Sequence, residues 1–248
     1  MINSKKRLHD AHVHIHDETL VQEMKKHNIS CIANAATKEE YAFLKAMQQI
    51  YDGIHISFGI HPWNAEKQTL EEELASLEET SFIGEIGMDN VWCDCAIAKQ
   101  KKILQEQLAY ASKHHKPVIL HTKGMEEEIA TCIKEYPNHY LVHWYSCMDH
   151  LQTYIDLGCY FTIGVSFMQD EAVKQVALKA PSNRILLESD GLGAVEWAMN
   201  RKIDVKDYYN ILETSLENLA KLRNVGIDDL YTQMNQNYEE FIKLGENR

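Results

Sequence analysis

The stretch Leu8-His-Asp-Ala-His-Val-His-Ile15 decides the fold that this sequence predicts. Apolar and polar residues alternate along it, as they do in a β-strand, and a helical pattern follows at 18–27. Because successive side chains of a strand point to opposite faces, Asp10, His12 and His14 project from the same face. Polar groups buried on such a face are costly unless hydrogen bonds or a metal ion satisfy them. We therefore expect either a metal site here or, as the plainer alternative, a partly exposed histidine-rich strand end.

The alternation of a short β-rich run with a longer amphipathic run repeats along the chain. Strands are expected at 8–15, 29–35, 54–60, 82–86, 117–121, 140–143, 160–163 and 185–188. Helices are expected between them at 18–27, 38–51, 69–79, 98–115, 125–136, 150–157 and 169–178. This order predicts an α/β protein, a TIM (β/α)8 barrel, and residues 1–248 have the length for one such domain. No Pro, Gly or Ser-rich linker divides them.

The tail of the sequence adds helices to the barrel pattern. A long helix is expected at 205–222, followed by two short ones within 228–244. They are expected to cover the outside of the barrel or its bottom.

Composition and charge exclude several classes of protein. With 25 Lys and Arg against 37 Asp and Glu, the net charge of −12 disfavours a broad basic face for duplex DNA. No apolar run approaches the roughly 18 to 20 residues of a membrane span, and the first residues lack the apolar core of a secretory signal. The six cysteines form no C-x-x-C pair, so we expect reduced thiols in a cytoplasmic protein without membrane contact.

Further residues able to bind a metal end other predicted strands. Glu85 lies in an apolar strand end between glycines, His121 and His143 close two more strands, and Asp190 follows the last one. Each alone has a plain structural explanation, but the carboxyl ends of barrel strands are where active sites are built. Four imidazoles and two carboxylates exceed one tetrahedral site, whereas a carboxylate bridging two ions would use them all. Nitrogen and oxygen ligands suit Zn, Mn or Mg, and the choice among these stays open.

The motifs as a set resemble those of the TatD-like metal-dependent hydrolases, or TatD-type deoxyribonucleases, of the amidohydrolase-like barrel superfamily. They are Asp10-Ala-His12-Val-His14, Gly59-Ile-His61-Pro62, Ile83-Gly-Glu85-Ile-Gly-Met-Asp89, Pro117-Val-Ile-Leu-His121-Thr-Lys123, His143-Trp-Tyr-Ser146 and Leu186-Leu-Glu188-Ser-Asp190. The resemblance spans nearly the whole chain. It implies two divalent ions with Glu85 bridging and with these ligands: His12, His14, Glu85, His121, His143 and Asp190.

The sequence also departs from the family pattern. After Asp190 it reads Gly-Leu-Gly-Ala-Val-Glu-Trp197, where the family usually continues with Ser-Pro and a proline-bearing loop. Lys123 stands where arginine is common, which keeps the charge but loses the two-pronged donor geometry. Cys147 stands where glycine is usual. These changes concern the residues that would meet a substrate.

The chemistry expected from this set is hydrolysis by a metal-activated water. The catalytic residues expected are Glu85, Asp190 as proton acceptor, and His61 and Lys123 as groups that orient a phosphate. Asp10 is expected to support a ligand histidine from behind. His61 could instead shape a loop, and Lys123 could be a solvated charge.

Three functions follow as alternatives. The first is a nuclease acting on single-stranded DNA or RNA ends, of the 3'-5' exodeoxyribonuclease type. The second is a hydrolase of a small ester, lactone or phosphate monoester, and the third is a metal-dependent interaction protein without catalysis. Five aromatic residues expected near the rim could stack on bases or serve only packing: Trp63, Trp92, Trp144, Tyr145 and Trp197. Oligomeric state is left open.

Overall fold

A ring of parallel strands forms the centre of the molecule in the computed structural model, which describes residues 7–246. Within these residues eight strands pair in the order of the sequence. They are β1 (His9–Val13), β2 (Ser30–Ala35), β3 (Ile54–Phe58), β4 (Phe82–Asp89), β5 (Val118–Lys123), β6 (Tyr140–His143), β7 (Tyr160–Gly164) and β8 (Ile185–Glu188). The ring continues from β8 to β1, where the backbone N–H of Asp190 donates to the carbonyl of His12 at 3.0 Å. The predicted TIM barrel is confirmed.

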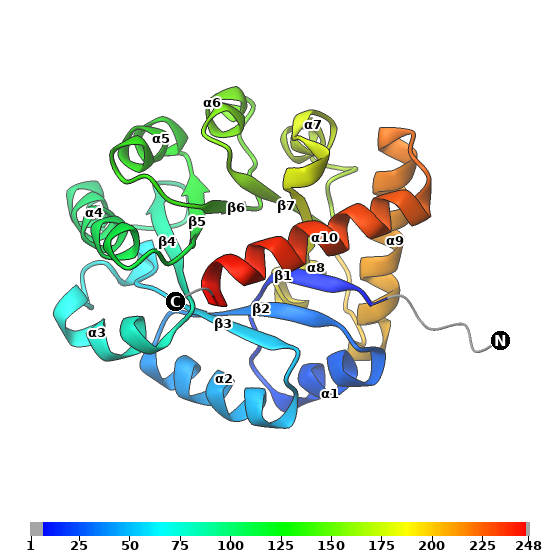
Figure 1. Cartoon of the computed structure of the whole chain (residues 1–248), viewed down its shortest axis with the longest axis horizontal. Helices are drawn as coiled ribbons and strands as arrows, with labels where there is room; N and C mark the ends of the chain where they lie inside the picture. Colours follow the sequence, from blue (N-terminus) through cyan, green and yellow to red (C-terminus); the bar gives the residue numbers. More distant parts are fainter. Residues whose placement is uncertain (1–6, 247–248) are drawn as a thin grey trace.

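Helices surround the sheet, one after each of the first seven strands (Figure 1). They are α1 (Glu18–His27), α2 (Lys38–Ile50), α3 (Leu70–Glu79), α4 (Ile97–Lys113), α5 (Glu126–Glu135), α6 (Leu151–Asp156) and α7 (Glu171–Lys179). Their ends follow local sequence signals. Asp17 caps α1 by accepting from the backbone N–H of Thr19, and Thr69 and Glu72 form a reciprocal capping box at the start of α3. Short 3-10 turns lie at Pro62–Asn64, Ser182–Arg184 and Val205–Asp207.

The chain after β8 differs from the prediction in two places. A helix that the sequence did not predict, α8 (Leu192–Met199), follows Asp190, and the next is α9 (Tyr208–Arg223). The two short helices predicted within 228–244 are wrong: one continuous helix, α10 (Ile227–Glu246), occupies the segment. Its buried residues recur every three or four positions along its whole length, so a single face stays packed and nothing interrupts the helix.

Helix α10 closes the end of the barrel at which the strands begin. It crosses this end in the foreground of Figure 1, drawn in red. Tyr238, Phe241 and Ile242 of α10 pack in one cluster with the lowest inward residues of the strands, which are Ala11, Ile32, Phe82, Ile119, Leu141, Tyr160 and Leu186. Of the two positions expected for the tail, the outside of the barrel or its bottom, α10 takes the bottom, and within residues 7–246 the opposite end stays open.

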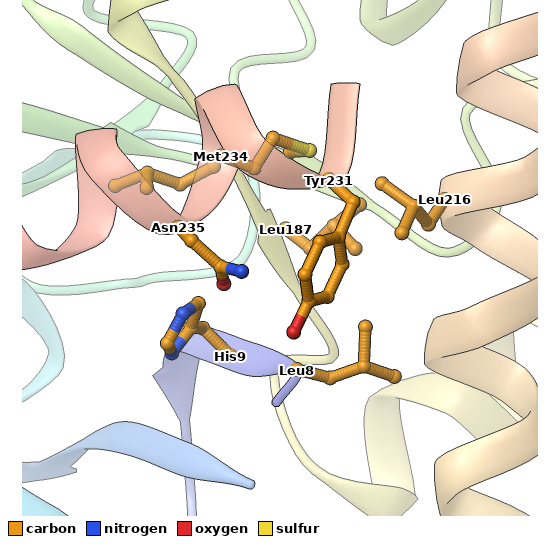
Figure 2. Close-up of a pocket in the computed structure, with 8 residues that line it drawn as sticks. Leu8, His9, Leu187, Leu216, Tyr231, Met234 and Asn235 are labelled. Atoms are coloured by element: carbon orange, nitrogen blue, oxygen red, sulfur yellow. The ribbon is translucent and has the colours of Figure 1, made fainter. Parts of the chain in front are cut away.

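A small cavity remains at the closed end, between β1, β8, α9 and α10. Figure 2 shows its lining, which includes Leu8, His9 and Leu187 below α10, with the Asn235 amide beside the His9 ring. Its volume is about 10 Å³, the room of about one water molecule. It is too small for a substrate. Among residues 7–246 no helix is long and apolar enough to cross a membrane.

Candidate metal centre

A cavity of about 1120 Å³ opens at the carboxyl ends of the strands. Five of the six predicted ligands line it: His14, Glu85, His121, His143 and Asp190. The sixth, His12, lies fully buried beneath them. The barrel therefore brings all six together, although they come from five different strands or strand ends.

Strand β1 supplies the first group of side chains. His12 and His14 lie on the same face of the strand, as the alternation of side chains requires. Their Nε2 atoms lie 3.5 and 3.4 Å from Oε2 of Glu85. The same two atoms lie 3.5 and 3.6 Å from Oδ1 of Asp190. Two imidazoles and two carboxylates thus converge on one point.

The second oxygen of Glu85 meets a second group. Nδ1 of His121 lies 2.6 Å and Nε2 of His143 lies 3.0 Å from Oε1 of Glu85. Nε2 of His61 lies 3.8 Å from the same oxygen. Gly87, two residues beyond Glu85, lets β4 approach β5 closely, because a Cβ there would lie 1.9 Å from the carbonyl oxygen of His121. The Glu85 carboxylate therefore stands between two groups of imidazoles.

The residues present fit divalent metal ions. Both ring nitrogens of His12 are buried and make no hydrogen bond within the described part of the chain, an arrangement that is costly without a further partner. Three sets of side chains offer ligand atoms within 4.8 Å of one another: His12, His143 and Asp190; His12, His14 and Glu85; and His61, Glu85 and His121. Nitrogen and oxygen donors of this kind suit Zn, Mn and similar ions.

The electrostatics of the cluster favour a cation. Burial by itself lowers the pKa of His143, but Glu85 and Glu188 outweigh burial and hold that pKa well above its usual value. Burial by itself raises the pKa of Glu85, but the surrounding histidines hold it well below its usual value. The same negative charge that stabilises an imidazolium would stabilise a divalent ion, and protons compete with the metal as the pH falls.

Comparison with known proteins agrees with this geometry. The family model described as TatD related DNase matches residues 9–243. The chain belongs to this family. Membership places it among the family's metal-dependent hydrolases.

Individual relatives of this TatD-family protein are distant in sequence. The uncharacterized metal-dependent hydrolase YjjV of Escherichia coli (strain K12) is 26% identical over 221 residues, or 82% of this chain and 85% of that protein. The 3'-5' ssDNA/RNA exonuclease TatD of Rahnella sp. (strain Y9602) is 27% identical over 173 residues, or 64% and 65% of the two chains. The crystal structure of YjjV matches the fold with a TM-score of 0.82 at 22% identity, covering 95% of this chain and 98% of that one.

Two buried carboxylates complete the site of the TatD-family protein, and neither was singled out from the sequence. Oδ2 of Asp89 lies 3.0 Å from Nε2 of His121, and Oε2 of Glu188 lies 3.2 Å from Nδ1 of His143. Both side chains are fully buried. A carboxylate on the far nitrogen fixes the orientation of a metal-binding imidazole. The sequence signal that could have identified both is an acidic residue at the end of an apolar strand. Asp89 and Glu188 each occupy such a position within the family motifs quoted above.

Asp10 holds a ligand histidine, as expected, and does so through the backbone of His12. Its carboxylate accepts from the backbone N–H of His12 at 3.3 Å and from that of Ser189 at 3.0 Å. The hydroxyls of Ser189 and Tyr208 also donate to it. Burial raises the pKa of Asp10 to about 6, although these hydrogen bonds act in the opposite direction. Asp10 thus joins the end of β1 to the end of β8.

His61 and Lys123 both lie at the cavity, but in different settings. Nδ1 of His61 accepts from the backbone N–H of Trp63 at 3.2 Å, while its Nε2 faces Glu85. Nζ of Lys123 donates to the carbonyl of Trp144 at 3.1 Å and to Oγ of Ser146 at 2.8 Å. The Lys123 ammonium is therefore held in place at the cavity wall and is not a freely solvated charge.

The five aromatic residues separate into two groups. Trp144 and Tyr145 are buried, and of these two only Trp144 reaches the cavity lining. Trp63, Trp92 and Trp197 are 50%, 63% and 70% exposed and line the cavity. All six cysteines are free in the structure, and Cys93 and Cys95 lie beside the same loop, where their thiols contact the carbonyls of Pro62 and Trp63.

Proposed function

We propose that this TatD-family protein is a two-metal hydrolase that removes nucleotides from the ends of single-stranded DNA or RNA. The observation that carries the proposal is the position of Glu85 between two groups of imidazoles. His12, His14 and Asp190 would hold one ion and His121 and His143 the other, with Glu85 shared. Ions bound there would supply a water of lowered pKa and would polarise a phosphoryl oxygen.

Asp190 is suited to accept a proton in this reaction. Its side chain is 24% exposed at the cavity, and its backbone is fixed by the hydrogen bond to His12. Burial raises the pKa of Asp190, but the nearby imidazoles of His12, His143 and His14 lower it overall. The carboxylate is therefore ionised at neutral pH and can take a proton from an attacking water and pass it to the leaving oxygen.

Lys123 and His61 are suited to orient the phosphate. The Lys123 ammonium has one more donor than its contacts with Trp144 and Ser146 use. A donor held in place before the substrate arrives stabilises developing negative charge without reorganisation. His61 presents Nε2 to the same region beside Glu85.

A single open end and an acidic exterior favour action at strand ends. The net charge of −12 repels a polyanion along most of the surface, whereas bound ions and Lys123 make the floor of the cavity locally cationic. A strand end can enter a cavity of about 1120 Å³, whereas a duplex needs a broad basic face. The Rahnella relative, named as a single-strand exonuclease, supports this choice.

A small ester, lactone or phosphate monoester is the alternative substrate. The observation that favours it is α8, which occupies the segment after Asp190 and brings Gly191, Gly193, Ala194 and Trp197 to the cavity wall. This segment departs from the family's usual sequence, so it is the part of the wall in which substrate choice would differ.

The test is hydrolysis of end-labelled single-stranded DNA by metal-stripped protein restored with Mg, Mn or Zn. The Glu85→Gln variant keeps the shape of the side chain but loses the charge shared between the two groups. We expect the activity of this variant to fall by more than about 10- to 100-fold, the loss typical when a residue that supports a metal ligand is replaced. Glu239→Gln, an exposed change on α10, is the matched control.

The outcomes separate the alternatives. Metal-dependent shortening from one end that is absent in Glu85→Gln supports the nuclease. Metal uptake without any cleavage would move the assignment to the small ester or lactone. An unchanged rate in Glu85→Gln would refute the proposed centre itself.

A further inference from the structure

Two tryptophans from opposite sides of the barrel meet over the open cavity. Trp92 lies in the loop after β4, and Trp197 lies on α8, which follows β8. In a ring of strands ordered β1 to β8, β4 and β8 are diametrically opposed. The ring centroids of the two indoles are nevertheless 6.5 Å apart, at an interplanar angle of 87°. The pair, here called the Trp92–Trp197 bridge, spans the mouth of the cavity.

The exposure of the bridge is not explained by packing. The indoles are 63% and 70% exposed, yet Trp is one of the residues that gains most free energy on burial. Helix α8 is anchored without Trp197, because Val195 is fully buried against Val165 and Ile211. Glu196 also binds Lys202 and the backbone N–H of Ile203. Exposed apolar surface that a fold does not need commonly marks a binding site.

The wall of α8 beside Trp197 is left open. Gly193 and Ala194 precede Trp197 by four and three residues, so both lie beside it on one face of α8, and all three line the cavity. A Cβ placed on Gly193 would meet no atom within 4 Å. Gly193 therefore leaves open space on the face of α8 that carries Trp197.

We infer that the Trp92–Trp197 bridge and the open surface at Gly193 form a subsite for a flat aromatic ring, occupied by a nucleobase of the strand end. The inference rests on the proposed function and names the part of the nucleotide that the mouth of the cavity recognises. The metal ligands and Lys123 at the floor match a phosphate, and the indoles at the mouth match the base attached to it. Every base has a π face, so this subsite accepts bases of any sequence.

Binding of thymidine monophosphate and of deoxyribose phosphate to the metal-loaded protein tests the subsite without requiring turnover. Calorimetry measures both affinities. Thymidine monophosphate is expected to bind about 10-fold more tightly than deoxyribose phosphate, because one stacked base contributes an effect of this order. Trp92→Leu and Trp197→Leu should remove the difference, whereas Trp92→Phe and Trp197→Phe should keep most of it. Gly193→Leu should also remove it by filling the open space, in a helix that tolerates leucine well.

Matched controls exclude a general effect. Met148→Ala alters a side chain that is 60% exposed but does not line the cavity, and should change neither affinity. Deoxyribose phosphate should bind equally to wild type and to all the tryptophan variants. Equal affinity of the two ligands for the wild type, or tryptophan variants that keep the difference, would overturn the inference.

Kinetic measurements distinguish a failure of the subsite from a failure of the proposed function. On single-stranded DNA the leucine variants should raise KM about 10-fold, and a strand ending in a base-free residue should lose its dependence on both tryptophans. Cleavage with the same KM in the wild type and in the tryptophan variants would overturn the subsite but would still support the nuclease. Tryptophan-dependent binding of thymidine monophosphate without cleavage of single-stranded DNA would support the subsite and refute the proposed nuclease function.

Discussion

Asp89 holds the far side of His121, and its other contacts explain why it can do so. Beyond His121 it accepts from the indole N–H of Trp63 and from the backbone N–H of Val91, both at 2.8 Å. These donors fix the carboxylate, and the carboxylate in turn fixes the imidazole. An orientation set in this way determines how well the opposite nitrogen can bind a metal.

Replacing Asp89 with asparagine should therefore weaken metal binding by about 10- to 100-fold while leaving the fold intact. The amide keeps one acceptor for the surrounding donors but loses the negative charge behind His121. Competition with a chelator measures the affinity, and circular dichroism measures the fold. Asp94→Asn, an exposed change in the same loop, is the control. An affinity equal to that of the wild type would show that Asp89 has a packing role only.

Strand alternation and strand ends were sufficient to identify the six residues that the barrel brings together. His12 and His14 share a face because a strand alternates. Glu85 lies in the middle of β4, and His121, His143 and Asp190 lie in or just after the carboxyl-terminal halves of their strands. Asp89 and Glu188 could not be assigned a role, because each becomes meaningful only once its partner histidine from another strand is seen beside it. The expected contact of Asp10 with a ligand histidine is made through the backbone of His12, whereas its contacts with Ser189, just after β8, and Tyr208 of α9 could not be predicted for the same reason.

At the scale of elements, the local sequence pattern failed to predict the end of β4 and the helix after β8. The predicted strand 82–86 ends too early, because β4 stays paired with β5 as far as Asp89, opposite Lys123. Helix α8 has no polar face to reveal its period, since seven of its eight residues are apolar or glycine. Its start depends on Gly191, which has a φ of 90° and at which a Cβ would lie 2.6 Å from the carbonyl oxygen of His14, so a side chain is excluded there.

Helix α10 should be the element whose loss destabilises the barrel most directly. Phe241 is fully buried, with its ring 5.6 Å from that of Phe82 and 5.2 Å from that of Tyr160. Phe241→Ala should lower the free energy of unfolding by about 3 to 5 kcal/mol, measured by urea denaturation. Glu239→Ala on the exposed side of the same helix should stay within about 0.5 kcal/mol of wild type. A loss below about 1 kcal/mol for Phe241→Ala would mean that α10 is not part of the core.

At the scale of the whole molecule, charge and chemistry are separated in space. The excess of acidic residues lies mostly on the solvated faces of outer helices such as α3 and α5, whose first turns carry Glu71, Glu72, Glu127 and Glu128. The five histidines of the candidate metal centre gather at the open end of the barrel: His12, His14, His61, His121 and His143. The overall charge of −12 was therefore a poor guide to the charge that a substrate meets at the cavity.

The closure of the lower end by Tyr238 and Phe241 also determines how a long strand would be processed. A nucleotide released in a blind-ended chamber must leave through the mouth that the strand still occupies, so the strand must back out before the next cut. Each cut is then followed by release, and every molecule in a population is trimmed a little before any is consumed. With labelled strand in large excess over enzyme, we expect a descending ladder of all lengths; full-length strand together with mononucleotide alone would require a second exit, which residues 7–246 do not provide.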